Sequence, residues 1–429
     1  MKYPTIDQSL FVLNRKKFTN NLKNNSLAIF NSSDEFPRSG DQNFIFKQNP
    51  DLFYLSGIDQ EQTILLLFPD CPNPLYREVL FLRQTNDYIK VWEGYKYTKE
   101  QAKAASGIQA VYWLEDFDNI LHSIVNYAEY IYLNTNENDR YAHEVPYRDI
   151  RFIEKMRAKY PLHHYERSAP IMRNLRAVKS DVEVELTKKA SAITRDAFIR
   201  VLKFTKPGVK EYEIEAEIIH EFIRQGGTGH AYTPIIASGH NANILHYNDN
   251  NQECKDGDVI LFDFGAEYAN YNADMSRSIP VNGRFTQRQK QVYNAVLHVM
   301  KASIKLIGEG TIWNSYHEQV GEIMTEQLVK LGLISTTDVK NQTAAWPAYK
   351  KYFMHGNSHH LGIDVHDFAG RYTPFAAGNI LTVEPGIYIP EEGLGIRLEN
   401  NILITEKGNV DLMADIPLEP EEIEDIMNS

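Results

Sequence analysis

Short apolar runs alternate with amphipathic stretches over residues 1 to about 170. Apolar runs bounded by polar turns are typical of strands, and apolar positions at intervals of three and four are typical of helices. Strands are predicted at 43–58 (NFIFKQNPDLFYLSGI), 63–68 (TILLLF) and 78–84 (EVLFLRQ), and helices at 98–106 (TKEQAKAAS) and 113–130 (WLEDFDNILHSIVNYAEY). This alternation predicts a layered α/β unit.

The remainder of the chain shows an order of elements that occurs twice. Ser180 and Glu183 form a capping box, which opens a long helix to about Phe204. Thr286 and Gln289 form the same kind of cap for a second long helix. In both halves the order is helix, glycine-containing turn, helix and β-segment. In the first half these elements cover 180–204, 206–208, 211–224 and 260–279. In the second half the first helix starts at 286, and the turn, the second helix and the β-segment cover 308–310, 315–331 and 380–405.

The length of the chain favours two domains. A chain of 429 residues is too long for one ordinary core. The boundary is expected near 170–178, which gives domains 1–172 and 173–429. The fold class is therefore α/β in the broad sense that includes α+β, with a repeated second domain.

Composition and charge exclude several classes of function. The hydrophobic share of 43% and the charged share of 24% are those of a globular protein. A net charge of −12 argues against nucleic acid as the main partner. The 2 cysteines are too few for a disulfide framework, and no signal peptide or membrane span is predicted. We expect a cytoplasmic protein.

The two β-segments each predict a pair of facing acids. If the first segment reverses at Tyr268-Ala269, antiparallel pairing puts Asp263 opposite Asp274. If the second reverses at Glu391-Glu392, Glu384 lies opposite Glu399. Such acids can be solvent-facing positions of alternating strands. Their recurrence in both halves favours a buried set instead, which a pair of divalent cations would neutralise.

The stretch 355–367, HGNSHHLGIDVHD, adds four histidines. His355 and His359 have the spacing of a helical zinc pair, but the glutamate of the HExxH motif is missing. Any metal held here needs ligands from elsewhere in the chain. Four carboxylates with one imidazole from this stretch suit two metal ions.

Together these motifs resemble a known family. DFGAEY with Asp274, the stretch MHGNSHHLGIDVHD, TVEPGIY and GIRLEN are similar to the pita-bread metallopeptidases, in the aminopeptidase P (Xaa-Pro aminopeptidase) branch. FKQNPDLFYLSGI and WEGYKYTKEQA resemble the first domain of that branch. The resemblance implies a creatinase/prolidase-like α/β domain, followed by a catalytic pita-bread domain with a pseudo-two-fold repeat.

The resemblance also implies roles for individual residues. The implied metal ligands are Asp263, Asp274, His359, Glu384 and Glu399, of which Asp274 and Glu399 bridge two ions. His246 and His366 would line the substrate site, and His355 and Arg397 would support the pocket and the carboxylates. Taken without the motifs, His246 is more simply a core histidine, and Arg397 could be a surface ion-pair residue, although its place two positions from Glu399 favours a role in orienting carboxylates.

The resemblance also implies the reaction, which is hydrolysis of the bond between an N-terminal residue and a penultimate proline. Two divalent ions per subunit, Mn²⁺ first with Zn²⁺ or Co²⁺ as alternatives, would hold a bridging hydroxide. Glu384 would act as general base and then acid. His246 and His366 would donate hydrogen bonds to the carbonyl oxygen, worth roughly 3–4 kcal/mol per donor.

Two other functions stay open at the level of the sequence. An Xaa-Pro dipeptidase (prolidase) would use the same ligands, and a non-catalytic pita-bread binding module would have discarded some of them. The family implies a homodimer or homotetramer that acts on peptides. Trp92 is a packing residue or a subunit-contact aromatic, and His360 is expected to be structural or on the surface.

Overall fold

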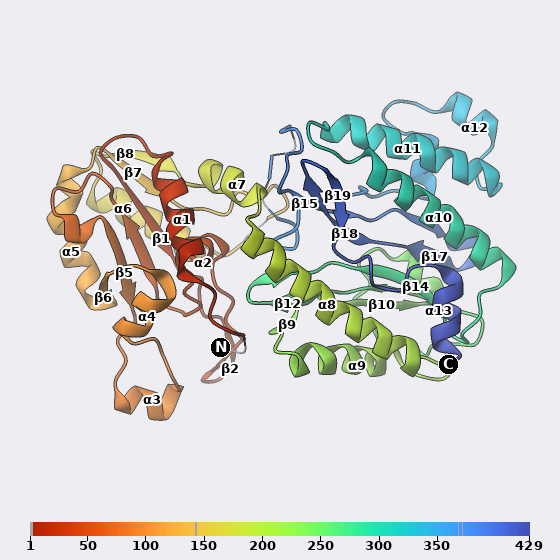
Figure 1. Ribbon diagram of the computed structural model, residues 1–429, viewed down its shortest axis with the longest axis horizontal. Helices are drawn as coiled ribbons and strands as arrows, with labels where there is room; N and C mark the ends of the chain where they lie inside the picture. Colours follow the sequence, from red (N-terminus) through yellow and green to blue (C-terminus); the bar gives the residue numbers. More distant parts are fainter. Residues whose placement is uncertain (1–2, 142–143, 368, 371) are drawn as a thin grey trace. The chain divides into compact units, whose positions relative to one another are not determined.

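The computed structural model describes residues 3–141, 144–367, 369–370 and 372–429 (Figure 1). The chain divides into two compact units, Pro4–Leu175 and Arg176–Ser429, the latter joined by the residues up to Tyr3. Among the described residues, no helix has the length and apolar character needed to cross a membrane.

The N-terminal unit is built on a six-stranded sheet in the order β6-β5-β4-β1-β7-β8. The strands are β1 (Ser26–Asn31), β4 (Ile64–Leu67), β5 (Glu78–Leu82), β6 (Ala110–Trp113), β7 (Tyr130–Leu133) and β8 (His164–Arg167). The helices include α1 (Gln8–Thr19), α2 (Pro50–Ser56), α3 (Asp87–Glu93), α4 (Lys99–Ser106), α5 (Phe117–Ile124) and α6 (Arg148–Lys159). The predicted strands at 63–68 and 78–84 and the helices within 98–106 and 113–130 are confirmed.

The predicted strand at 43–58 is wrong. Asn49 caps helix α2 by accepting hydrogen bonds from the backbone N–H groups of Asp51 and Leu52, and Pro50 occupies the first helical position. Within α2, the consecutive apolar residues Leu52 to Leu55 are all buried, so this part of the run resembles a buried strand. Burial on every side removes the helical periodicity from the sequence.

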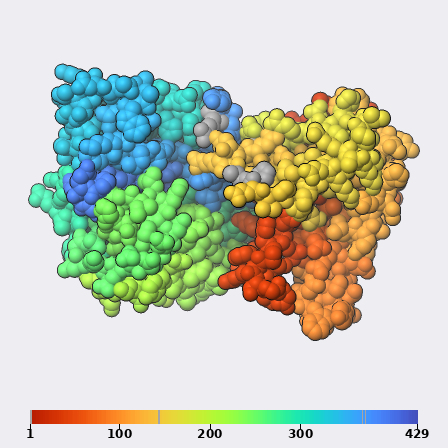
Figure 2. Space-filling view, turned by 180° about the vertical axis from the view of Figure 1, so that it is seen from behind, coloured from red at the N-terminus to blue at the C-terminus, as the bar shows by residue number. Residues whose placement is uncertain are grey.

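The C-terminal unit contains the two repeats. Their paired helices are α8 (Asp181–Phe204) with α9 (Glu211–Arg224), and α10 (Gln287–Leu306) with α11 (Trp313–Lys330). Both capping boxes are formed, at Ser180 with Glu183 and at Thr286 with Gln289. One hydrophobic core joins the helices of both halves to the strands, since Ile193 and Ile214 share it with Val296 and Val320. The first half (green) and the second half (blue) occupy separate parts of this unit's surface in Figure 2.

The β-segments form antiparallel hairpins that pack against the paired helices in the shared core. The first half contains β9 (Gly229–His230), β10 (Ile235–Ser238), β11 (Val259–Asp263), β12 (Ala266–Tyr268), β13 (Tyr271–Asn272) and β14 (Ser276–Pro280). The second half contains β15 (Ile380–Val383), β16 (Gly386–Ile389), β17 (Leu394–Arg397), β18 (Asn400–Thr405) and β19 (Gly408–Asp411), and α13 (Pro420–Met427) ends the fold.

The register of the second hairpin is the predicted one. Gly386 pairs with Arg397 in β16–β17, and Val383 pairs with Asn400 in β15–β18. Both ladders place Glu384 opposite Glu399, because the same register runs through the segment between them.

The register of the first hairpin differs from the prediction by two residues. Asp263 pairs with Ser276, not with Asp274. The turn residues are Ala269 and Asn270, both with positive φ (51° and 67°), a conformation that asparagine tolerates well. A shift of two preserves the face on which each side chain lies, so Asp263 and Asp274 still point to the same side.

Candidate metal centre

The first hairpin brings Asp263 and Asp274 to one face through a close approach of its two strands. Asp263 ends β11, and Asp274 lies between β13 and β14. A Cβ on Gly265 would lie 1.8 Å from the carbonyl oxygen of Ala273, so only glycine fits at this position.

The second hairpin is hydrogen-bonded directly to the first. The backbone N–H of Glu399 donates to the carbonyl oxygen of Ser276 (3.0 Å), and the Ser276 hydroxyl donates to Glu399 Oε2 (2.8 Å). The side-chain amide of Asn401 donates to the carbonyl oxygen of Asp274 (2.6 Å) and accepts from its N–H (3.1 Å). The acids of the two halves are therefore held together by hydrogen bonds of the backbone and of the Ser276 and Asn401 side chains.

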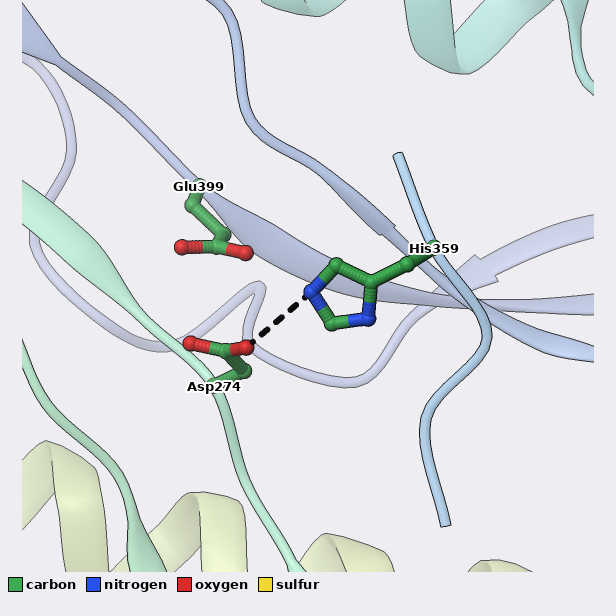
Figure 3. Close-up of side chains that lie close together, drawn as sticks. All are labelled: Asp274, His359 and Glu399. Atoms are coloured by element: carbon green, nitrogen blue, oxygen red, sulfur yellow. Dashed lines mark ion pairs between the residues drawn. The ribbon is translucent and has the colours of Figure 1, made fainter. Parts of the chain in front are cut away.

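Asp274, His359 and Glu399 form a buried group whose ligand atoms all lie within 4.8 Å of one another (Figure 3). His359 Nε2 lies 3.3 Å from Asp274 Oδ2 and 3.8 Å from Glu384 Oε1. The Nδ1 atom of His359 lies 2.9 Å from the carbonyl oxygen of His360. That carbonyl can only accept, so Nδ1 carries the hydrogen and Nε2 is directed to the carboxylates, as in metal-binding histidines.

Asp263 is linked to the group through two side chains. The Tyr232 hydroxyl contacts both Asp263 Oδ1 and Asp274 Oδ1, and Arg397 Nη2 donates to Asp263 Oδ2. Tyr232 was missed by sequence reasoning, because a lone tyrosine between β9 and β10 has no motif that marks it. Only the fold brings it to the carboxylates.

Burial changes the protonation of these acids. It raises the pKa of Glu384 to about 7, and it raises those of Asp274 and Glu399, with the neighbouring carboxylates adding to the effect. Burial lowers the pKa of His359, but the hydrogen bond to Asp274 and the charge of Glu384 outweigh it, so the net direction is upward. Facing carboxylates repel one another unless a cation lies between them. The donor set of carboxylate oxygens and one imidazole therefore fits divalent metal ions.

Arg397 and His355 lie beside the carboxylates, and both contact the hydroxyl group of Tyr388. Arg397 donates to the Tyr388 hydroxyl (2.9 Å) and to Ser276 Oγ (2.9 Å), in addition to Asp263. His355 Nε2 lies 2.7 Å from the same Tyr388 hydroxyl. Burial, followed by the charge of Arg397, lowers the pKa of His355 to about 3, so this imidazole is neutral.

The remaining histidines differ in placement. The rings of His366 and His359 meet edge to face, with centroids 4.4 Å apart, while the His366 side chain is exposed. His246 is also exposed. His360 is buried and stacks on Trp313 with centroids 6.1 Å apart, as expected of a structural histidine. Trp92 is 72% exposed on α3.

Comparison with known proteins places this site in a family. Residues 185–406 match "Metallopeptidase family M24", and residues 11–132 match "Aminopeptidase P, N-terminal domain". The chain belongs to the M24 metallopeptidases, which have the pita-bread fold. Within them it belongs to the aminopeptidase P branch, as its sequence motifs predicted.

Full-length relatives agree with this assignment. The chain is 34% identical to the Xaa-Pro aminopeptidase of Escherichia coli over 98% of both chains. Among solved structures it is similar to the aminopeptidase PepP of Pseudomonas aeruginosa (TM-score 0.90, 31% identity, 99% of this chain and 98% of that one). It is also similar to a Zn-substituted E. coli aminopeptidase P in complex with product (TM-score 0.88, 31% identity, 99% of both chains).

Proposed function

We propose that this protein is a metal-dependent Xaa-Pro aminopeptidase, which hydrolyses the bond between an N-terminal residue and a penultimate proline. The single observation that supports this most is the convergence of two acid-bearing hairpins and His359 in one buried group. The names of the full-length relatives support the substrate class.

The proposed ligands are the five residues expected from the sequence: Asp263, Asp274, His359, Glu384 and Glu399. They would hold two divalent ions, with Mn²⁺ favoured by the oxygen-rich set and Zn²⁺ or Co²⁺ as alternatives. Such ions, when bound, lower the pKa of water and polarise a carbonyl group. Asp274 and Glu399, the more deeply buried acids of this set, would both be ligands.

Glu384 is the proposed proton carrier. Its side chain is 20% exposed, whereas those of Asp274 and Glu399 are buried, so solvent water reaches Glu384 more easily than it reaches those two acids. A carboxylate at this place can take a proton from the attacking water and return it to the proline nitrogen that leaves. His355 Nδ1 lies 3.9 Å from Glu384 Oε2 and limits its position.

His246 and His366 are the proposed donors to the substrate carbonyl. Both are exposed, as groups that meet a substrate must be, and His366 contacts the ligand His359 through its ring. Arg397 would hold Asp263 in place, since its guanidinium is fixed by Tyr388 and Ser276. The roles of His355 and Arg397 are thus to support the reacting groups.

The finer features of the protein are also proposals. We propose 1–172 as the aminopeptidase-P-like domain and 173–429 as the catalytic domain, a cytoplasmic location, and a homodimer or homotetramer. The exposed Trp92, with Tyr88 and Tyr95 near it, supports a contact surface on α3. The partners would be peptides with a penultimate proline.

The decisive experiment follows hydrolysis of Arg-Pro-Pro and Gly-Pro by metal-stripped protein, with and without added Mn²⁺. Release of Arg only with metal, while Gly-Pro stays largely intact, is the expected result. Preferential cleavage of Gly-Pro would make the protein an Xaa-Pro dipeptidase. Inactivity on both peptides with metal bound would favour a binding module.

A further inference from the structure

The loop that presents His366 is closed on itself. The N–H of Asp367 donates to the carbonyl oxygen of His360 (2.8 Å), and the N–H of Gly362 donates to the carbonyl oxygen of Asp364 (3.0 Å). The start of this segment is held by β15, because Leu361 donates to Ile380 (3.0 Å). The segment 362–367, here termed the His366 loop, therefore leaves β15 after Leu361 and is closed by the hydrogen bond from Asp367 to His360.

The His366 loop is also tied to the hairpin that bears Asp274. The side-chain amide of Asn272 donates to the carbonyl oxygens of Gly362 (3.0 Å) and Ile363 (2.7 Å), and its backbone N–H donates to Gly362 as well (3.0 Å). Asn272 precedes Asp274 by two residues. These hydrogen bonds therefore fix the distance between the His366 loop and Asp274, a proposed metal ligand.

Two buried cations hold the other end of the loop. Lys179 Nζ lies 2.8 Å from Asp367 Oδ2, and Arg176 Nη2 bonds to Asp367 Oδ1 and, at 2.6 Å, to Asp364 Oδ2. The side chains of Asp367, Lys179 and Arg176 are only 2%, 1% and 4% exposed. Removing such charges from water costs several kcal/mol per ion, and apolar residues of the same size are often at least as stable. Stability alone is therefore a poor reason for this cluster, and placement of the loop is a better one.

We propose that Arg176, Lys179 and Asp367 are positioning residues that fix the His366 imidazole for the reaction. This inference rests on the proposed function, in which His366 donates a hydrogen bond to the substrate carbonyl. His366 is exposed and adjacent in sequence to Asp367, so its main chain is fixed by the buried Asp367 carboxylate. Misplacement of a catalytic group by about 1 Å can cost about 100-fold in rate.

Two variants test the proposal in different ways. Asp367→Asn keeps the size of the side chain and weakens both ion pairs. Gly362→Ala changes no charge, but its Cβ would lie 2.2 Å from Asp367 Oδ2 and 2.9 Å from Lys179 Cε, so it would displace the side chains of this ion pair. Each variant should lower kcat about 10- to 100-fold on an Arg-Pro-Pro substrate, with KM and bound metal within about 2-fold of wild type.

A double-mutant cycle separates positioning from general damage. Combined with His366→Ala, neither Asp367→Asn nor Gly362→Ala should reduce kcat further, because the group that they position is gone. The matched control is Lys290→Met, which removes another lysine that pairs with carboxylates, at Glu421 and Glu424. It should leave kcat within about 2-fold of wild type.

Each contrary result has a distinct meaning. Equal losses from Asp367→Asn with and without His366 would overturn the positioning role, as would wild-type kcat in both loop variants. If Asp367→Asn does not fold, Gly362→Ala alone decides. Wild-type kcat in His366→Ala would remove the role of His366 and this inference with it. Failure of the wild-type protein to cleave Arg-Pro-Pro would instead refute the proposed function.

Discussion

The two units of the chain bury acids in different ways. In the N-terminal unit, Asp149 is buried near Asp51, and each acid has its own amide donors: Asn31 (3.0 Å) and Asn49 (3.4 Å) for Asp149, and Asn134 (2.9 Å) for Asp51. In the C-terminal unit, Asp274 and Glu399 are buried facing each other and an imidazole. Uncharged amide donors can satisfy a single acid. Asp274 and Glu399 also receive hydroxyl groups, from Tyr232 and Ser276, but these donors do not remove the repulsion between carboxylates that lie within 4.8 Å of each other. Similar burial therefore indicates a cation site in the C-terminal unit and a structural position in the N-terminal unit.

The variant with the largest expected effect on the C-terminal site is Glu384→Gln. If Glu384 moves the proton, kcat should fall about 10²- to 10⁴-fold while the protein stays folded. The matched control is Glu392→Gln, on the loop of the same hairpin, where the acid pairs with Arg288 at the surface. Near wild-type turnover of Glu384→Gln at saturating metal, measured by release of Arg from Arg-Pro-Pro, would remove this role.

Removal of the imidazole tests the ligand set. His359→Ala should lose one metal equivalent per chain by elemental analysis, because Nε2 is the one imidazole nitrogen directed at the carboxylates of the described group. His298→Ala, on the exposed side of α10, is the control and should bind metal as the wild type does. Equal metal content in both variants would refute His359 as a ligand.

Removal of the metal should affect the two units unequally. An ion present at about 100 times its Kd stabilises the state that binds it by about 3 kcal/mol. Hydrogen exchange after chelation should therefore increase in peptides that cover β11 to β14 and 380–405. Peptides that cover β1 and β7 should exchange as before. Equal loss of protection in both units would contradict a cation site confined to the C-terminal unit.

The smallest expected effect concerns pH and Asp149. Burial, opposed by the hydrogen bond from Asn31, raises the pKa of Asp149 from 3.8 to about 7. The folded protein then holds a proton that the unfolded chain releases, so this residue's contribution to stability is full below about pH 4 and is lost as the pH rises through 7. In Asp149→Asn, the free energy of unfolding should depend less on pH between 4 and 7, with kcat unchanged. The free energy of unfolding would be measured by urea unfolding at several pH values. If it changes with pH as steeply in Asp149→Asn as in the wild type, Asp149 does not titrate between pH 4 and 7.

Local patterns in the sequence were sufficient to predict most of the helices and β-segments of the C-terminal unit. Capping boxes such as Ser180 with Glu183 depend on residues three positions apart, so they can be found without the fold. The helix at Pro50–Ser56 was missed because its residues from Asp51 to Ser56 are all buried and its short apolar run has no distinctive period. The first hairpin was misplaced by two residues because its turn, Ala269-Asn270, lacks the glycine that usually marks such turns.

The sequence by itself determined the family, the order of elements, and which acids and histidine were candidates for the site, since motifs and periodicity are local properties. Only the tertiary structure decided how these residues meet. The Tyr232 hydroxyl between two acids, the Arg397 guanidinium on Asp263, and the hold of Lys179 on Asp367 join residues far apart in the chain. Such contacts depend on side chains that the packed core brings together, and no local pattern encodes them.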